Sequence, residues 1–265
     1  MSIDYTDMVK RFSGFAELYN RFRPRPPDDL GHLLTQWAHM DSPDLVIDLG
    51  CGTGLSTRYW AERAIQVIGI DPSSDMLQAA QAQTHLPNVS YRQGFGHQTG
   101  LPDHCADIIT CCDSLHWMEP GSTFAEIVRV LRPGGVFAWL YFSEPVMTPW
   151  EIDQAHQQFW QKSKAADEAR SVTRAVLRWP KAEYVRCMQA SFRWVCQLEL
   201  HQTGMSDAEQ LVGWVSTYGH VQSLFKLGAT EADIGLDEFA RTAHRILGKT
   251  STPWYASVQI SAGIK

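Results

Sequence analysis

An apolar strand that runs straight into a glycine-rich turn constrains the fold of this chain more than any other feature. Residues 45–49 are apolar apart from Asp48, and Gly50-Cys51-Gly52-Thr53-Gly54 follows directly. Glycine is used where the backbone must approach a ligand closely or adopt a positive φ. The free N–H groups of a helix N-terminus would lie at the same place. The segment therefore predicts a strand, a ligand-binding turn and a helix in direct succession.

Strands and helices are expected to alternate with short connections through residues 45–143. Near-continuous apolar strands between amphipathic helices are typical of a parallel sheet covered on both faces. We therefore expect an α/β fold with a doubly wound, mostly parallel sheet of about seven strands, whose last strand is antiparallel. The expected strands are 45–49, 66–70, 89–93, 107–112 and 136–142, and the expected helices are 54–63, 73–83 and 123–131.

The pattern changes after residue 142 and is also different before residue 41. Helical spacing is expected over most of 5–40, with a break at Arg23-Pro24-Arg25-Pro26-Pro27. Ser206 and Glu209 predict a capping box at the start of a later helix. We expect N-terminal helices over the ligand site at 1–40, a ligand-binding core at 41–143, and a substrate cap with two closing strands at 144–265. The expected cap elements are helices at 153–164, 180–190, 206–218 and 237–247, and strands at 192–201 and 254–264.

Composition narrows the function classes. The net charge of −6 over 265 residues leaves no electrostatic footprint for nucleic acid. The N-terminus lacks the layout of a signal peptide, and no apolar run approaches the roughly 20 residues that span a bilayer. The six cysteines include no C-x-x-C pair, so no metal site is expected. A cytoplasmic protein without a membrane or nucleic-acid partner is predicted.

An acidic residue at the end of the second strand suggests a nucleoside. Asp71 follows the glycine turn by about 20 residues, where a carboxylate can accept hydrogen bonds from ribose hydroxyls. The turn reads G-x-G-x-G rather than the G-x-G-x-x-G of dinucleotide-binding proteins. Asp48, just before the turn, suits a neighbouring ammonium or sulfonium group better than a diphosphate.

With these residues in view, the chain resembles the class I S-adenosylmethionine-dependent methyltransferases, which have a Rossmann-like fold. The resemblance covers roughly residues 42–143. It rests on Val46–Gly54, on Gly69–Ser73 with Met76-Leu77, and on Val130–Gly135. It implies S-adenosylmethionine as cofactor and S-adenosylhomocysteine as product. A finer likeness, to the small-molecule subgroup that includes trans-aconitate methyltransferases, rests on Phe15-Ala16, Tyr19, Arg23-Pro24 and Asp113–Trp117.

The resemblance assigns cofactor roles residue by residue. The glycine turn would surround the methionine moiety, Asp48 would orient the turn, and Asp71 would hold the ribose. Gly94-Phe95-Gly96-His97 departs from the acidic run that the family often places against adenine. Phe95 packing, with His97 as a partner, is therefore the expected substitute. The predicted cofactor-binding residues are Tyr19, Asp48, Gly50, Cys51, Gly52, Gly54, Asp71, Pro72, Met76, Phe95, His97, Cys112 and Asp113.

Acceptor residues are expected after the fourth strand and in the cap. His116 is the candidate general base because it titrates near neutral pH, although a histidine that only shapes the pocket fits the sequence as well. Trp117 is expected to form a pocket wall. Arg23 and Arg25 could meet an anion or lie in a solvated basic loop. Trp150, Trp214 and Tyr218 could line the cap or simply pack in its core.

Three functions remain open at this point. The leading hypothesis is methyl transfer to a small carboxylate, phenol, amine or acidic carbon by a monomer or homodimer. A nucleic-acid or protein methyltransferase is the second, and the acidic charge weighs against it. The third is an accessory protein that binds the cofactor without transferring methyl, for which a damaged cofactor turn would be the sign.

Overall fold

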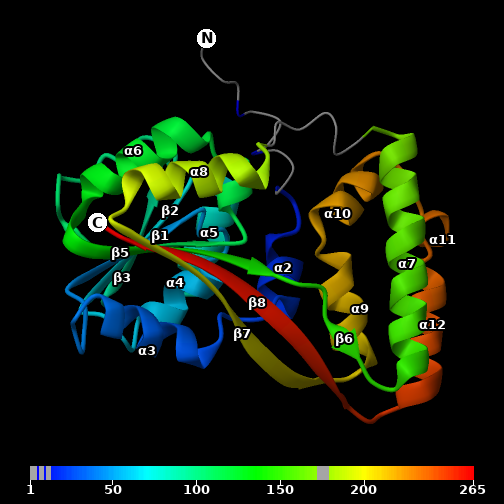
Figure 1. Cartoon of the computed structure of the whole chain (residues 1–265). Helices are drawn as coiled ribbons and strands as arrows, with labels where there is room; N and C mark the ends of the chain where they lie inside the picture. The colour runs from blue at the N-terminus through cyan, green and yellow to red at the C-terminus, as the bar shows by residue number, and fades with distance from the viewer. Residues whose placement is uncertain (1–4, 6–8, 10–12, 172–178) are drawn as a thin grey trace. The chain divides into compact units, whose positions relative to one another are not determined.

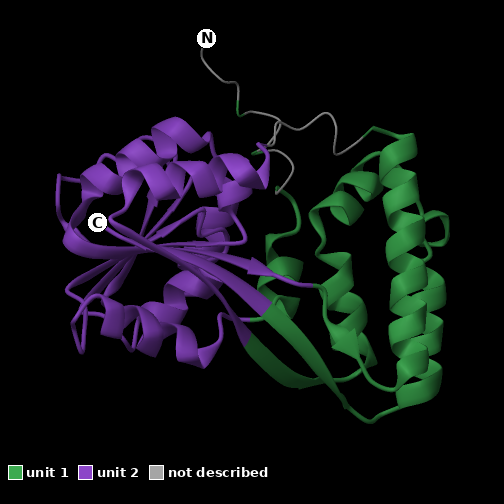
Figure 2. Cartoon of the chain, viewed as in Figure 1, with its two compact units in different colours: residues 1–24, 144–177, 201–257 green, residues 25–143, 178–200, 258–265 purple. Residues whose placement is uncertain are grey.

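The computed structural model describes residues 5, 9, 13–171 and 179–265, so residues 6–8 and 10–12 of the predicted N-terminal helix lie outside it. The chain forms two compact units, drawn in green and purple in Figure 2. Unit 1 comprises residues 1–24, 144–177 and 201–257, and unit 2 comprises 25–143, 178–200 and 258–265. The two units are defined by the compactness of the folded chain and not by function. The expected division by function at residues 40 and 143 stays a prediction.

Most of the β-sheet lies in unit 2, whereas β6, residues 201–206 of β7 and residues 252–257 of β8 belong to unit 1. Within the described residues the sheet has eight strands in the order β3-β2-β1-β4-β5-β8-β6, with β7 also paired to β8. The pairs β1–β2, β1–β4, β2–β3 and β4–β5 are parallel, whereas β8 is antiparallel to β5. This confirms the doubly wound, Rossmann-like architecture. The strands are β1 Leu45–Leu49, β2 Gln66–Asp71, β3 Val89–Gln93, β4 Ala106–Cys112, β5 Leu131–Phe142, β7 Trp194–Ser206 and β8 Thr252–Ile264.

Helices cover both faces of this sheet (Figure 1). On one face, Leu30, Leu34 and Trp60 of α3 and α4 pack on apolar residues of β1, β2, β5 and β8. On the other, Phe124 of α6 and Tyr184 of α8 pack on β1, β4 and β5. Burial of both faces explains why the central strands β1 and β4 are largely apolar instead of alternating. The helices of unit 2 are α3 Asp28–Trp37, α4 Leu55–Trp60, α5 Ser74–Ala82, η1 Leu115–Trp117, α6 Pro120–Val130 and α8 Lys181–Ser191.

Unit 1 is mainly helical and has its own apolar core. Its helices α7 and α9 contribute Phe159 and Leu211, and α12 contributes Phe239, all of which are nearly inaccessible to solvent. A short strand, β6 Val146–Met147, pairs antiparallel with Trp254 and Tyr255 of β8. The helices are α2 Ala16–Phe22, α7 Trp150–Ala169, α9 Ala208–Ser216, α10 Gly219–Lys226, α11 Glu231–Ile234 and α12 Leu236–Leu247.

The structure corrects several local predictions and adds elements that the sequence pattern missed. Helix α6 begins at Pro120 rather than at Thr123, β5 begins at Leu131 rather than at Val136, and β7 runs over Trp194–Ser206 rather than over 192–201. The capping box of α9 is formed by Asp207 and Gln210, one residue later than Ser206 and Glu209. Asp207 takes the N-cap because its carboxylate accepts from the Gln210 N–H, at 2.8 Å. Helices α10 and α11 and strand β6 were not anticipated, since such short elements carry little periodic signal. No helix in the described part of the chain is both long and apolar enough to cross a membrane.

Candidate functional site

The turn after β1 has three glycines in left-handed conformations, but their surroundings differ. Gly50, Gly52 and Gly54 have φ of +69°, +52° and +80°. A Cβ on Gly50 would lie 2.5 Å from the Cβ of Ser114, and one on Gly54 would lie 2.2 Å from the Tyr91 hydroxyl. A Cβ on Gly52 would meet no described atom within 4 Å. Gly50 and Gly54 therefore serve the packing of the turn, whereas Gly52 faces open space.

Asp71, at the end of β2, binds the backbone of the turn. Its Oδ2 accepts from the Gly52 N–H at 2.9 Å, and its Oδ1 accepts from the Ser73 N–H at 2.8 Å. Burial raises the pKa of Asp71, and these two N–H groups act against that increase. A carboxylate oxygen can accept more than one hydrogen bond, so both oxygens retain acceptor capacity. Asp71 therefore positions the open glycine and can still receive hydroxyl donors.

Asp48 is fully buried beneath the turn and is held by hydroxyl groups. Its Oδ2 accepts from Ser56 Oγ at 2.6 Å and from Thr57 Oγ1 at 2.7 Å, both in the first turn of α4. Its Oδ1 accepts from Thr110 Oγ1 of β4 at 3.4 Å. Burial raises the pKa of Asp48 to about 6, against the lowering effect of these hydroxyls. The carboxyl thus ties β1 to the start of α4, as expected of a residue that orients the turn.

The raised pKa of Asp48 makes a prediction about stability. Folding favours the protonated carboxyl of Asp48. The contribution of this carboxyl to the unfolding free energy is therefore full below the ordinary pKa of 3.8 and is lost as pH rises through about 6. This difference corresponds to about 3 kcal/mol. We expect Asp48→Asn to gain about 3 kcal/mol of unfolding free energy relative to the wild type between pH 4 and pH 7.5. Urea unfolding at several pH values measures this gain. Asp44→Asn, at an exposed position before the same strand, is the control. A difference for Asp48→Asn that does not vary with pH would contradict the prediction.

Residues that the resemblance places around adenosine follow β2 and β3. Met76 is buried on α5, where its N–H donates to the N-cap Ser73 Oγ at 3.3 Å, and Pro72 is half-buried. The rings of Phe95 and His97 stack with centroids 5.4 Å apart and an interplanar angle of 27°. A Cβ on the intervening Gly96 would lie 2.6 Å from Met118 Sδ, so glycine at this position lets Met118 approach the backbone closely.

The segment after β4 carries the residues predicted for the methionine end and the acceptor. Asp113 has a φ of +54°, and its N–H donates to the Leu140 carbonyl at 2.9 Å. His116 and Trp117 lie on η1 with ring centroids 4.7 Å apart. Trp117 is buried and His116 is half-buried. The structure therefore brings these side chains together at the carboxyl end of β4.

The cysteines near the turn are neutral thiols. Burial, followed by the charge of Asp71, raises the pKa of Cys51 well above 9. Burial, followed by Asp48, does the same for Cys112 and for its neighbour Cys111. A thiol that stays protonated is a poor nucleophile and a poor metal ligand. No group of three or more His, Cys, Asp or Glu side chains among the described residues is arranged to hold a metal.

The other predicted residues, apart from Arg25, lie in unit 1. Arg23 places its guanidinium 5.2 Å from the Tyr19 ring and 5.4 Å from the Tyr218 ring, so these three side chains form one group. The Tyr218 hydroxyl is also 3.4 Å from His156 Nε2. Trp214 is buried and lines a cavity, whereas Trp150, the first residue of α7, is 68% exposed. Arg25 is exposed and lies in unit 2.

Several residues that shape the site were not identified from the sequence. Ser114 fills the space beside Gly50 and donates its hydroxyl to the Leu49 carbonyl at 2.7 Å. Tyr91 lies beside Gly54 and also beside Gly69, where a Cβ would be 2.8 Å from the tyrosine ring. A glycine inside a strand often marks such a close approach, so Gly69 was an available signal. Ser114 had none.

The fold and the turn define a nucleoside-binding α/β protein, and comparisons with known proteins specify it further. A family described as a methyltransferase domain matches residues 47–139. A trans-aconitate 2-methyltransferase of Acidovorax ebreus is 30% identical over 242 residues, covering 84% of this chain and 86% of that protein. A candidate type II methyltransferase from Anaeromyxobacter dehalogenans superposes with a TM-score of 0.69 at 24% identity, covering 92% of this chain and 98% of the other. The chain belongs to the class I S-adenosylmethionine-dependent methyltransferases.

Other relatives match over a shorter stretch. An uncharacterized methyltransferase of Mycobacterium tuberculosis is 34% identical over 136 residues, covering 51% of this chain. The match spans 53% of that protein, so the chain covers about half the length of such relatives.

Proposed function

We propose that this protein transfers a methyl group from S-adenosylmethionine to a small-molecule acceptor. The observation that carries the proposal is the geometry at Gly52. Its N–H donates to the Asp71 carboxylate, while the position of its missing Cβ faces open space. A backbone held in this way leaves room for a ligand directly beside an acid that can accept ribose hydroxyls.

The residues around the turn fit the proposed cofactor. The backbone of Gly50 and Cys51 would face the methionine moiety, and the Asp71 oxygens would accept from the ribose. Cys112 and Asp113 would border the methionine end, and Tyr19 is proposed to reach the cofactor from α2. The residues proposed to contact adenosine are Pro72, Met76, Phe95 and His97.

In the chemical step, the main task of the side chains is to position the reactants. When bound, the sulfonium supplies the reactive methyl group, and S-adenosylhomocysteine remains as the product. The chain's own residues bind the acceptor, align its nucleophile with the methyl group and exclude water. Orientation of this kind can contribute about 7–11 kcal/mol to lowering a barrier.

The acceptor is proposed to be a carboxylate, a phenol, an amine or an acidic carbon. The likeness to a trans-aconitate 2-methyltransferase over 84% of the chain supports a small acid. Trp117 and the unit 1 residues Arg23, Trp150, Trp214 and Tyr218 are the proposed acceptor contacts. Of these, Arg23 carries the positive charge that an anionic acceptor would need.

Two experiments test the proposal. Calorimetry should detect one molecule of S-adenosylhomocysteine per chain and no binding of NAD. The reverse result would exclude the proposed cofactor. An acceptor screen with radiolabelled S-adenosylmethionine should then label small acids, phenols or amines, whereas label in RNA or protein would refute the small-molecule assignment.

His116 is proposed as the general base for acceptors that must lose a proton. We expect His116→Ala to lower kcat about 100-fold with a phenol acceptor and to remove the acidic limb of its pH profile. A carboxylate acceptor needs no base, so its kcat should be little changed. His244→Ala, on an exposed position of α12, is the matched control. Equal losses with both acceptor types would show that His116 only shapes the pocket.

The two competing functions have less support. A net charge of −6 disfavours a nucleic-acid substrate. The buried, neutral thiol of Cys111 is unsuited to attack a pyrimidine. An accessory role without transfer would tolerate a damaged cofactor turn, yet all three glycines adopt the conformations that the turn needs. We propose a monomer or homodimer without a nucleic-acid partner.

A further inference from the structure

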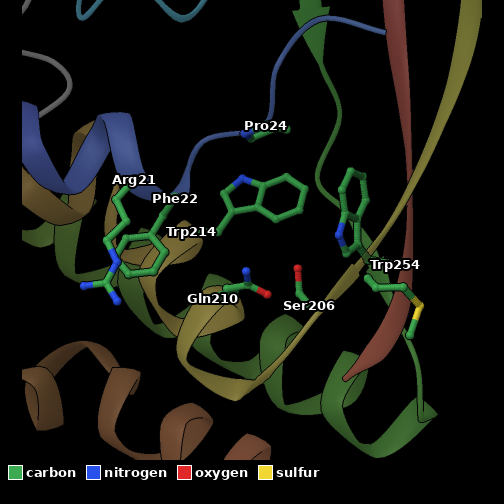
Figure 3. Close-up of a pocket in the computed structure, with 8 residues that line it drawn as sticks. Arg21, Phe22, Pro24, Ser206, Gln210, Trp214 and Trp254 are labelled. Carbon is green, nitrogen blue, oxygen red and sulfur yellow. The ribbon is translucent and has the colours of Figure 1, made fainter. Parts of the chain in front are cut away.

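Unit 1 contains a cavity of about 160 Å³ that the proposed cofactor site does not use. It lies between the end of α2, the first turns of α9 and the paired strands β7 and β8 (Figure 3). All of its lining residues belong to unit 1. We propose that this cavity is a binding site for a small aromatic carboxylate.

The walls of the cavity are aromatic and fixed in place. The indole rings of Trp214 and Trp254 meet edge to face, with centroids 4.9 Å apart and an interplanar angle of 77°. They are only 4% and 8% exposed, so each ring is held by its surroundings. Phe22, Pro24 and Met205 complete the apolar lining. Such a surface suits a flat, apolar ligand body.

Two glycines make room for these walls. A Cβ on Gly204 of β7 would lie 2.5 Å from Cζ2 of Trp254. A Cβ on Gly213 of α9 would lie 2.4 Å from Cδ1 of Phe22. Any other residue would displace the ring that it faces, because real Cβ atoms do not approach so closely. The ring positions that define the cavity therefore depend on glycine at both sites.

The volume limits the size of the ligand. An engineered apolar cavity of about 150 Å³ holds one benzene molecule. The cavity of unit 1, at about 160 Å³, therefore accommodates one six-membered ring with a small substituent. A nucleoside or a larger cofactor is too big for it.

The polar groups at the cavity are mainly hydrogen-bond donors. Figure 3 shows the Ser206 hydroxyl and the nitrogen-bearing edge of the Trp254 indole facing the same space, with the Gln210 amide beside Ser206. Gln210 Oε1 already accepts from the Asp207 N–H at 3.1 Å, which leaves Nε2 to donate. Within the described residues, neither Trp254 Nε1 nor Gln210 Nε2 has a hydrogen-bond acceptor. A ligand with acceptor oxygens would satisfy these donors, whereas a cationic ligand would leave them without acceptors.

An arginine at the rim adds further N–H donors for an acceptor-rich ligand. Arg21 is the only ionisable residue that lines the cavity in the described part of the chain. Its Nη2 donates to Glu209 Oε1 at 2.7 Å, and a guanidinium has further N–H groups to offer. Aromatic walls also suit quaternary ammonium ions, but such a ligand has no acceptor for the N–H groups of Arg21, Gln210 and Trp254.

The test uses the full chain and calorimetry with three probes: benzoate, benzamide and benzyltrimethylammonium. We expect benzoate to bind with one site per chain, benzamide to bind more weakly, and benzyltrimethylammonium not to bind. Trp254→Phe keeps an aromatic six-membered ring but removes the pyrrole ring with its N–H, and should weaken benzoate about 5-fold. Trp194→Phe, a partly exposed tryptophan of unit 2, should leave the affinity for benzoate unchanged.

A second variant separates the cavity from its fold, and a third separates it from the proposed cofactor site; Trp214, a proposed acceptor contact, lines the cavity and is therefore left unchanged. Gln210→Met removes the amide donor at an exposed position and should also weaken benzoate, with only a small fall in melting temperature, because Oε1 no longer accepts from the Asp207 N–H. Asp71→Asn, which lies in unit 2, should leave benzoate binding intact while it weakens S-adenosylhomocysteine. No binding of benzoate, preferential binding of the ammonium probe, or a benzoate affinity insensitive to both Trp254→Phe and Gln210→Met would overturn the proposal. None of these results bears on the proposed cofactor.

Discussion

Replacing Asp71 by Asn is expected to weaken S-adenosylhomocysteine binding about 100-fold, because two hydrogen bonds to a charged acceptor are worth about 3 kcal/mol or more. The carboxylate accepts from Gly52 and Ser73 N–H groups and is proposed to accept from the ribose as well. An amide has one acceptor oxygen, and its NH2 group would face an N–H donor. Calorimetry with the product measures this loss without needing an acceptor.

The matched control is Asp75→Asn, an exposed carboxyl in the first turn of α5. It removes the same charge four residues away and should change the affinity for the product less than 3-fold, as expected of an exposed charge. Thermal unfolding should show that both variants are folded. Equal affinity of Asp71→Asn and wild type would remove Asp71 from the cofactor site.

Replacing the glycines of the turn should separate ligand binding from folding. Gly52→Ala is expected to cost about 1 kcal/mol of unfolding free energy, because alanine is strained at a positive φ. Its methyl group would, however, enter the open space proposed for the cofactor. We expect the affinity for the product to fall at least about 30-fold, because the methyl group of alanine would occupy space that the ligand needs.

Gly54→Ala should behave in the opposite way. Its Cβ would lie 2.2 Å from the Tyr91 hydroxyl, so overpacking adds to the backbone strain. We expect a loss of about 3 kcal/mol in unfolding free energy. Tyr91→Phe removes the clashing oxygen, so the double variant should recover part of that loss. Urea unfolding and calorimetry on all variants test the distinction. If Gly52→Ala binds the product normally, the cofactor does not approach the backbone at residue 52.

Local patterns predicted the sheet well, for reasons visible in particular elements. The bounds of β1 and β3 agree with the predicted ranges, and β2 and β4 differ by a single residue. β1, β2 and β4 are mostly apolar runs bounded at their C-terminal ends by glycine or aspartate, whereas β3 is largely polar and is bounded by Gly94. Such limits are local properties. The cap was less regular. Its short elements β6, α10 and α11 depend on packing in unit 1 rather than on periodicity.

In the candidate site, too, some features follow from the sequence and others from the tertiary structure. The sequence by itself determined the glycine turn and the acid Asp71, because their spacing along one strand–turn–helix–strand unit brings them together in any doubly wound sheet. Only the tertiary structure decided that Gly52 is the open glycine, since Ser114 and Tyr91 come from later strands and loops. It also decided the donor-lined cavity between Trp214 and Trp254, forty residues apart. Contacts at such separations depend on how whole elements pack, and no local period or motif encodes them.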